Sequence, residues 1–356
     1  MTVQVKTELG RTYTTTYSYD LGNRVNTITY PDNRIVSYSR DNVGRITVVN
    51  ATANGVSVPI ATGRTYRADG LLLTQTYGNG LNEVRSYDTQ GHLTYQSLGS
   101  ADTRVYAYDA NGNLTQKQSL PDVASYGYDA LDRLESEVTT LATNAYTYDG
   151  NGNRLSGLLP NGTTQAYSYS PNTNRLVQKG NQAFSLDAAG NTISDRNENR
   201  VFSYNDAGRL TQVTRQGTLR GTYSYNHQSQ RTRKVKVTNT GVTKTFVYHY
   251  DMQGQLLAET KEDGTPIRAY VWANDEPIAQ IQYKPNQQTD QLLYLHTDHL
   301  GTPRLATGST QTPVWRWESQ AFGQGQPDLP SIKGMHQLGI FNPLLIAVSA
   351  ETGSRD

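Results

Sequence analysis

The sequence contains no cysteine, and this absence excludes several classes of protein. Among its 356 residues none is Cys, so the chain forms no disulfide framework, no thiolate zinc site and no cysteine nucleophile. An excess of charge of one sign is also lacking, because 32 Lys and Arg residues face 31 Asp and Glu residues and the formal net charge is +1. So neutral a chain has no strong non-specific attraction to nucleic acid or anionic lipid. We therefore expect no nucleic-acid partner.

Long hydrophobic runs are missing as well. Residues 1–6 include no apolar stretch of the kind found in a signal peptide. The one apolar run of note, residues 340–350, is interrupted by Asn342 and Pro343 and is too short to span a bilayer. We expect no membrane insertion, and with no secretory signal visible the protein would be cytoplasmic before any export.

Phenylalanine and tryptophan are scarce, whereas tyrosine is abundant. There are 5 Phe and 3 Trp residues against 25 Tyr. Tyrosine can bury its ring while its hydroxyl finds water or a partner, so it suits a sheet that is wet on one face. Only 35% of residues are hydrophobic, and long amphipathic helical patterns are absent. The composition predicts an all-β chain rich in turns.

A short phrase recurs along most of the chain: Tyr-x-Tyr-Asp, then a glycine turn, then a leucine. The cleanest copies begin at Tyr106, Tyr126 and Tyr146. The spacing between the last tyrosines of these copies is 20 residues. A fixed period of this kind indicates an array of one small structural unit. Aligned on the last tyrosine of the phrase, twelve units fall at Tyr19, Tyr38, Tyr66, Tyr87, Tyr108, Tyr128, Tyr148, Tyr169, Leu186, Tyr204, Tyr225 and Tyr250.

Each unit has the residues of a β-hairpin. Tyr-x-Tyr places two rings on one face of a strand, because side chains alternate with a period of two. Asp-x-x-Gly supplies the positive-φ position of a tight turn, and the leucine begins the returning strand. Dipeptides such as Asn54-Gly55 predict further hairpin turns between units. We interpret the longer gaps at residues 50–59 and 239–241 as extended loops.

Twelve hairpins predict on the order of 24 strands, and an open sheet rarely exceeds ~10 strands without curling or splitting. The sheet must therefore curl, as a coiled wall or as a propeller. A propeller with an enzymatic or scaffold role would repeat every ~40–45 residues. The units at Tyr108, Tyr128 and Tyr148 are too alike for such alternation.

Two features together resemble bacterial Rhs proteins and teneurin-type surface proteins. The tyrosine–aspartate units resemble YD repeats. Residues 294–304, followed by 315–318 and 321–323, are similar to the Rhs repeat-associated core signature. The resemblance covers about residues 10–323. It divides the chain into a YD-repeat array at 1–260, a core segment at 261–323 and a divergent tail at 324–356.

The resemblance implies a long antiparallel sheet that curls into a hollow, spiral, shell-like wall around a cavity. In that family the shell encloses a toxic C-terminal polypeptide delivered by type VI secretion, by Tc-type toxin complexes or by contact between cells. It thus implies a toxin cargo and secretion or delivery proteins as partners, and a secreted or cell-surface location in a bacterium. The implied function is a non-enzymatic structural shell.

The sequence departs from the family pattern at both ends. We expect no delivery domain before the first repeat and no toxin domain after the tail, and the sequence contains no Asp-Pro dipeptide for the self-cleavage that the resemblance implies. We expect an incomplete shell, an orphan or truncated copy without its toxin, whose tail from Gln324 is diverged or frame-shifted.

Candidate sites have simpler structural interpretations. His296, Asp298 and His299 form the most ligand-like cluster, but on a strand the third side chain points away, and we interpret them as part of a polar turn. Six repeated aspartates could pair as glycosidase carboxylates, yet their place before a turn glycine predicts turn caps. These aspartates are Asp20, Asp88, Asp109, Asp129, Asp149 and Asp251. Gly112 and Gly152 lack the Lys-Ser/Thr of a phosphate loop. We expect no catalytic, cofactor or metal residues.

The tyrosine stripe leaves one functional alternative open. Tyrosine rings can stack on sugars, so the array could be an extracellular or cell-surface carbohydrate-binding or adhesion module. Known glycan-binding repeats of similar period rely on tryptophan, and Trp272, Trp315 and Trp317 lie outside the array. Cross-strand packing of the tyrosines is the favoured interpretation.

Overall fold

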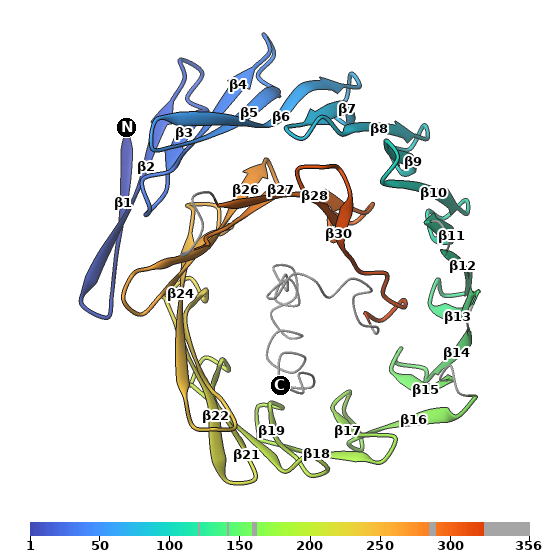
Figure 1. Ribbon diagram of the computed structural model, residues 1–356. Coiled ribbons are helices and arrows are strands. Elements are labelled where there is room, and N and C mark those ends of the chain that lie inside the picture. Colours follow the sequence, from blue (N-terminus) through green and yellow to red (C-terminus); the bar gives the residue numbers. More distant parts are fainter. Residues whose placement is uncertain (120–121, 141, 159–161, 285–289, 324–356) are drawn as a thin grey trace. The chain divides into compact units, whose positions relative to one another are not determined.

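The fold consists of β-strands joined by short turns (Figure 1). A computed structural model describes residues 1–356 except 120–121, 141, 159–161, 285–289 and 324–356. In the described residues there are 30 strands and no helix, and hence no helical segment able to span a membrane. The all-β prediction is confirmed. The predicted tail at 324–356 lies outside the described residues.

Contacts divide the chain into two compact units, the first comprising residues 1–103 and 246–356 and the second residues 104–245. Within each unit, consecutive strands pair antiparallel. In the first unit, β1–β9 pair in sequence, as do β24–β30. In the second unit, β10–β23 pair in the same way. The division at residues 260 and 323 stays a prediction.

The strands of the first unit before the boundary are β1 (Thr2–Glu8), β2 (Arg11–Tyr19), β3 (Val25–Thr29), β4 (Ile35–Arg40), β5 (Ile46–Ala53), β6 (Val56–Tyr66), β7 (Leu72–Tyr77), β8 (Asn82–Tyr87) and β9 (Leu93–Leu98). The next strands are β10 (Asp102–Tyr108), β11 (Leu114–Ser119), β12 (Asp122–Tyr128), β13 (Leu134–Thr139), β14 (Thr143–Tyr148), β15 (Arg154–Leu158), β16 (Thr164–Tyr169), β17 (Leu176–Lys179), β18 (Gln182–Leu186), β19 (Thr192–Asp195), β20 (Arg200–Tyr204), β21 (Leu210–Arg215), β22 (Thr218–Tyr225) and β23 (Arg231–Val237). The last are β24 (Thr243–Tyr250), β25 (Leu256–Lys261), β26 (Pro266–Ala273), β27 (Glu276–Gln282), β28 (Gln291–Thr297), β29 (Pro303–Thr307) and β30 (Pro313–Arg316).

The recurring hairpin has one extra residue beside its turn. In the unit at Tyr108 the pairing shifts between Ala107 and Tyr108, so that Tyr108 pairs with Leu114. The main-chain N–H of Gly112 donates to the carbonyl of Asp109 at 3.1 Å. Gly112 has φ of 87°, a conformation that costs glycine little and other residues more. The glycine of the phrase is thus a conformational requirement of a bulged turn.

Two details of the predicted array are wrong. Residues 50–59, expected to be an extended loop, lie in β5 and β6, and Asn54-Gly55 forms the short turn between these strands with φ of 51° and 78°. The unit aligned on Tyr38 is two residues early, because the register shift falls between Ser39 and Arg40. An arginine occupies the position of the last tyrosine there, so alignment on tyrosine selected the first ring of the phrase.

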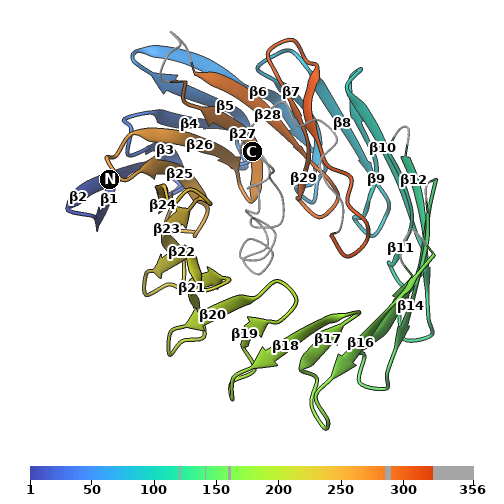
Figure 2. The ribbon, with the colours of Figure 1, turned by 60° about the horizontal axis from the view of Figure 1, so that its bottom comes forward.

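The first unit contains two layers. The wall, defined as β1–β9, lies against the core layer, defined as β25–β30. Figures 1 and 2 show β26, β27 and β28 alongside β5, β6 and β7. Both faces of the core layer are buried, since every residue of β27 after Glu276 is buried, whereas wall strands such as β4 alternate between buried and exposed positions.

The second unit is a single sheet in the described residues. Buried and exposed side chains alternate along its strands, as in β14, where Asn144 and Tyr146 are buried and Ala145 is exposed. We call the side that carries the first tyrosine of each phrase the tyrosine face. Its buried rings include those of Tyr106, Tyr146, Tyr167, Phe202 and Tyr223.

Candidate functional site

The repeated aspartates cap turns, as the sequence predicts. In the turn after Tyr128, the Oδ1 atom of Asp129 accepts hydrogen bonds from the main-chain N–H groups of Leu131 and Arg133 at 2.9 and 3.1 Å. The same pair of contacts, to the second and fourth residues after the cap, occurs at Asp20, Asp41, Asp88, Asp109, Asp149, Asp251 and Asp298. Asn205 and Asn226 replace aspartate with the same geometry. An acceptor oxygen is therefore what the position requires.

These carboxylates are held in their ionised form. Hydrogen bonds from the side chain and the main chain of Asn113 are the main reason that the pKa of Asp109 lies below its usual value. Asp149 has a lowered pKa for the same reason, with Asn153 as donor. Asp251 is the exception, since burial raises its pKa. A carboxylate held as an acceptor by its own turn is poorly suited to donate a proton as a general acid.

Side chains of one turn reach the next turn along the sheet. Arg133 Nη1 donates to the carbonyl of Asp149 at 2.9 Å, and Arg67 Nη1 donates to the carbonyl of Asp88 at 2.7 Å. Arg133 and Arg67 lie in turns, and the carbonyls that they contact belong to the next turn of the array. Arginine side chains of the turns thus connect neighbouring units.

The last tyrosine of the phrase forms a second connection between units. Its hydroxyl donates to a main-chain carbonyl in the preceding unit, for example from Tyr128 to Leu114 at 2.9 Å and from Tyr148 to Leu134 at 2.7 Å. Tyr87, Tyr169, Tyr204 and Tyr225 donate in the same way to Leu72, Arg154, Thr192 and Leu210. In the core layer Trp272 takes this role, with Nε1 donating to the carbonyl of Leu256 at 2.9 Å. Sequence analysis missed this unit because an indole replaces the phenol.

The rings of the first tyrosines are not available as a sugar platform. Tyr106, Tyr146 and Tyr223 are only 3–7% exposed, whereas stacking on a sugar requires an open ring face. Arginines cover further rings, as where the guanidinium carbon of Arg154 lies 4.3 Å from the ring centre of Tyr167. These rings pack within the sheet, in agreement with the favoured interpretation.

The histidine–aspartate cluster at 296–299 forms part of the core layer. His296 is fully buried and its Nε2 lies 2.9 Å from Thr307 Oγ1, while Asp298 caps its turn and accepts from Arg304 Nε at 2.7 Å. The predicted polar turn is confirmed for Asp298, at which the turn between β28 and β29 begins, whereas His296 lies in the strand β28. In the part of the chain that the structure describes, no three acidic or histidine side chains gather as metal ligands do.

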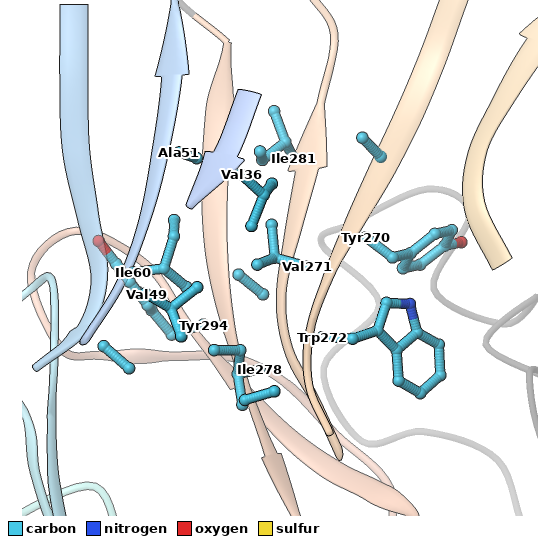
Figure 3. Packing of buried hydrophobic residues seen from close by; sticks show 14 of the residues in the cluster. Val36, Val49, Ala51, Ile60, Tyr270, Val271, Trp272, Ile278, Ile281 and Tyr294 are labelled. Atoms are coloured by element: carbon cyan, nitrogen blue, oxygen red, sulfur yellow. The ribbon is translucent and has the colours of Figure 1, made fainter. Parts of the chain in front are cut away.

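Apolar side chains make up the centre of the contact between the wall and the core layer (Figure 3). Val36, Val49 and Ile60 of the wall are completely buried. They face Val271 and Ile281 of the core layer and belong to the same cluster. Burial of one such side chain is worth about 1.5–3 kcal/mol. This cluster therefore stabilises the contact between the wall and the core layer.

Polar contacts surround this apolar centre. Tyr30 donates through its hydroxyl to the carbonyl of Tyr270 at 2.8 Å. Arg85 of β8 reaches Glu276 Oε1 at 2.5 Å, across a separation of 191 residues in the sequence. Further contacts between the layers join Arg34 to Asp290, Tyr283 to Asp32, Asn79 to Gly308 and Gln96 to Thr297, and Arg316 of the core layer also contacts Asp102 of β10.

The carboxylate beside this contact is fully buried and charged. Glu83 is 0% exposed and accepts from Arg85 Nε at 2.6 Å. Burial alone would favour the neutral acid, but the charge of Arg85 and hydrogen bonds from Arg85, Gln75 and Gln96 outweigh it and lower the pKa of Glu83 to about 2. The ion pair therefore persists throughout the physiological pH range.

With this geometry established, a comparison with protein families identifies the array. Residues 121–329 match the model described as Teneurin YD-shell, which is more than half of the chain. The chain belongs to the teneurin YD-shell family. The resemblance noted from the Tyr-x-Tyr-Asp phrase is thereby confirmed. No curated protein sequence matches the chain.

Solved structures share the YD-shell fold at low sequence identity. The Tc holotoxin pore of Photorhabdus luminescens matches at 18% identity with a TM-score of 0.74, over 88% of this chain and 18% of the other. The TcdB2-TccC3-Cdc42 structure matches at 20% identity, with the same TM-score and the same coverage of both chains. The TcdB2-TccC3 structure matches at 18% identity with a TM-score of 0.72, again over 88% and 18%. The YD-shell chain described here spans less than a fifth of the length of these relatives.

The functional features of this YD-shell chain are thus the surface of its repeat array and the interface between the wall and the core layer. Turn side chains, tyrosine hydroxyls and buried rings connect each unit to the next, and the wall of the first unit contacts the core layer. The sequence predicted the aspartate caps and the packing of the tyrosine rings, because their parts lie within one or two repeats, but it did not predict the hydroxyl bonds between units. It gave no signal for Glu83, Arg85 and Glu276, whose partners lie on strands distant in the sequence.

Proposed function

We propose that this chain is a non-enzymatic structural part of an Rhs-type toxin shell, whose wall encloses a polypeptide cargo. The observation that carries the proposal is the pairing of a YD-repeat wall with a core layer packed on it. Such a layered wall provides mechanical separation and requires no chemistry. Membership of the YD-shell family and the fold of the Tc toxin structures support this assignment.

The use of the polar groups also supports a structural role. Asp129 and its counterparts are occupied as turn caps, and Tyr128 and its counterparts bond to neighbouring units. A catalytic carboxylate pair would be a singular feature of the chain, whereas these groups recur with the repeat. Their recurrence fits a wall assembled from equivalent hairpins.

The second unit offers the surface that a cargo would meet. In its described residues it is one layer of strands, so no other strand of that unit covers its faces. The face opposite the tyrosines combines small polar side chains, as where Thr147 and Ser156 lie hydrogen-bonded at 2.6 Å, with exposed valines such as Val105, Val138 and Val201. Such a mixed surface fits contact with a polypeptide without a specific binding site.

Protease protection tests enclosure directly. A flexible peptide with a cleavage site for a specific protease is fused after Asp356 in one protein and before Met1 in another. We expect the C-terminal site to be cut several-fold more slowly than the N-terminal site. A Val271→Asp variant places a charge in the apolar contact of the first unit and should remove the protection. Equal cleavage rates at the two termini of the unchanged chain would contradict enclosure.

Family membership extends the proposal to partners and location. We propose a toxin polypeptide as cargo, secretion or delivery proteins as partners, and export from a bacterial cell as the route. Carbohydrate binding is not proposed, because the buried rings of Tyr106, Tyr146 and Tyr223 offer no open stacking face.

A further inference from the structure

The apolar contact between the wall and the core layer does not by itself select one alignment. Ala269, Val271 and Ala273 are buried and alternate along β26, so they lie on one face of the strand. A slide of two residues, about 6.6 Å along a strand, would keep the same face inward and leave apolar groups against apolar groups. Hydrophobic contact is non-directional and discriminates weakly between these positions.

Covalent continuity does not fix the alignment either. Glu83 and Arg85 belong to β8, whereas Glu276 begins β27, and residues 104–245 of the second unit separate the two strands in sequence. Because the connection between β8 and β27 is so long, the alignment of the core layer on the wall must be set by contacts between the two layers.

Polar contacts at both ends of β27 do distinguish one alignment from another. At its first residue, Glu276 Oε1 lies 2.5 Å from Arg85 Nη2, and beyond its last residue Tyr283 donates a hydrogen bond to Asp32 of the wall. Gln96 joins the next hairpin to the same place, donating to Glu83 Oε1 at 2.7 Å and to the carbonyl of Thr297 at 3.1 Å.

We propose that Arg85 determines the register in which the core layer seats on the wall, by bridging Glu83 of the wall and Glu276 of the core layer. This inference goes beyond the proposed function and rests on the first unit alone. In any shifted alignment Arg85 would retain Glu83 and lose Glu276, while Gln96 would lose Thr297. Glu276 would then retain the hydroxyl of Thr297 but lose its charged partner, and the freed donors of Arg85 and Gln96 would be buried without partners, which is unfavourable.

The geometry also explains why arginine occupies this position. Its guanidinium presents several donors in a fixed plane and can meet two carboxylates from different directions. Here Nε contacts Glu83 and Nη2 contacts Glu276. Its side chain is 11% exposed, compared with 0% for Glu83 and 17% for Glu276. A buried ion pair contributes little net stability compared with apolar groups of similar size. Removal of one partner is nevertheless costly, because the other charge is left buried and unpaired. Discrimination between registers is the effect that such a pair can supply.

The chain's lack of cysteine provides a clean reporter of register. The Nδ2 atom of Asn79 in the wall lies 3.2 Å from the Oγ1 atom of Thr307 in the core layer. We expect an Asn79→Cys, Thr307→Cys protein to form its disulfide nearly completely on mild oxidation. In that background, Glu83→Leu, Arg85→Met and Glu276→Leu together replace the bridge with apolar groups.

The expected result is a several-fold fall in disulfide yield, with a thermal midpoint of unfolding that is unchanged or raised. Val36→Ala is the matched control, since it weakens the same interface without touching the bridge: it should lower the midpoint and leave the yield unchanged. An unchanged yield in the triple variant would show that apolar packing sets the register and would overturn the proposal.

A milder variant keeps the test decisive if the triple variant does not fold. Arg85→Lys retains the charge but offers a single point of contact, so it cannot bridge both carboxylates. We expect its disulfide yield to fall while the protein stays folded by circular dichroism. A disulfide yield equal to that of the Asn79→Cys, Thr307→Cys protein with Arg85 in place would overturn the assignment to Arg85. Because the readout is alignment of the two layers, failure here leaves the enclosure test unaffected.

Discussion

The hydroxyl of Tyr128 donates a hydrogen bond to the main-chain carbonyl of Leu114, 2.9 Å away in the preceding unit. The same contact recurs from Tyr148 to Leu134 at 2.7 Å. The tyrosine therefore belongs structurally to two hairpins at once, with its main chain in one and its hydroxyl in the other. In a nearest-neighbour array, such contacts supply the coupling that makes units fold together.

Removal of one hydroxyl should measure this coupling. Tyr128→Phe keeps the ring but leaves the Leu114 carbonyl without its donor, and we expect a loss of about 1 kcal/mol in the free energy of unfolding. Urea denaturation followed by circular dichroism gives the value. Tyr95→Phe, at a ring that is 37% exposed, is the control and should change stability far less. An equal effect of both substitutions would argue against the inter-unit hydrogen bond.

Turn caps should depend on an acceptor oxygen and little on charge. The Oδ1 atom of Asn205 accepts from the N–H groups of Ala207 and Arg209 at 3.2 and 2.9 Å. Asn205→Ala should therefore destabilise the protein by about 1 kcal/mol, in the range for losing a capping side chain, whereas Asn205→Asp should be nearly neutral. Thermal denaturation of the two variants decides the matter, and a large loss in the aspartate variant would refute the interpretation.

Two glycines in one turn should respond in opposite ways to alanine. Gly152 has φ of 83° and Gly150 does not have a positive φ, while a Cβ at either would meet nothing within 4 Å. Gly152→Ala should cost about 1–2 kcal/mol, because a Cβ disfavours the left-handed conformation. Gly150→Ala should be neutral or stabilise by about 0.4–1 kcal/mol through the unfolded chain. Denaturant midpoints of the pair provide the comparison, and similar losses at both sites would contradict it.

Acid should weaken the first unit through a buried histidine. The ring of His249 lies 4.4 Å from that of Tyr13, and burial, aided by Lys6, lowers the pKa of His249 to about 3. The unfolded chain, with an ordinary histidine, binds more protons between pH 6.5 and 3, so stability must fall as the pH falls through this window. Between pH 6.5 and 5 we expect a loss of about 2 kcal/mol.

Substitution of this histidine should flatten that dependence. His249→Gln removes the titrating group, and its stability between pH 5 and 6.5 should be nearly constant in urea titrations. His227→Gln, at an exposed position, is the matched control and should retain the slope of the unchanged protein. A slope that survives in His249→Gln would show that another group is responsible.

The repeat could be predicted because its determinants are local. Asp109, Gly112 and Leu114 stand within six residues, and their order alone specifies cap, left-handed turn and returning strand. The same logic failed where the residue type changed but the geometry persisted. Arg40 and Trp272 take the place of the last tyrosine, as the register shifts beside them and the indole hydrogen bond of Trp272 show.

The sequence by itself determined the hairpin, its period and the use of aspartate and glycine in turns, since these depend on φ preferences and hydrogen bonds between near neighbours. Tertiary structure alone decided that β26 and β27 pack on β4–β6, and that Arg85 meets Glu276. Such contacts join strands on opposite sides of a long connection. Apolar alternation indicates that a face is buried without stating what covers it. The partner is chosen by the summed packing and charge pairing of the folded chain, which no short stretch of sequence contains.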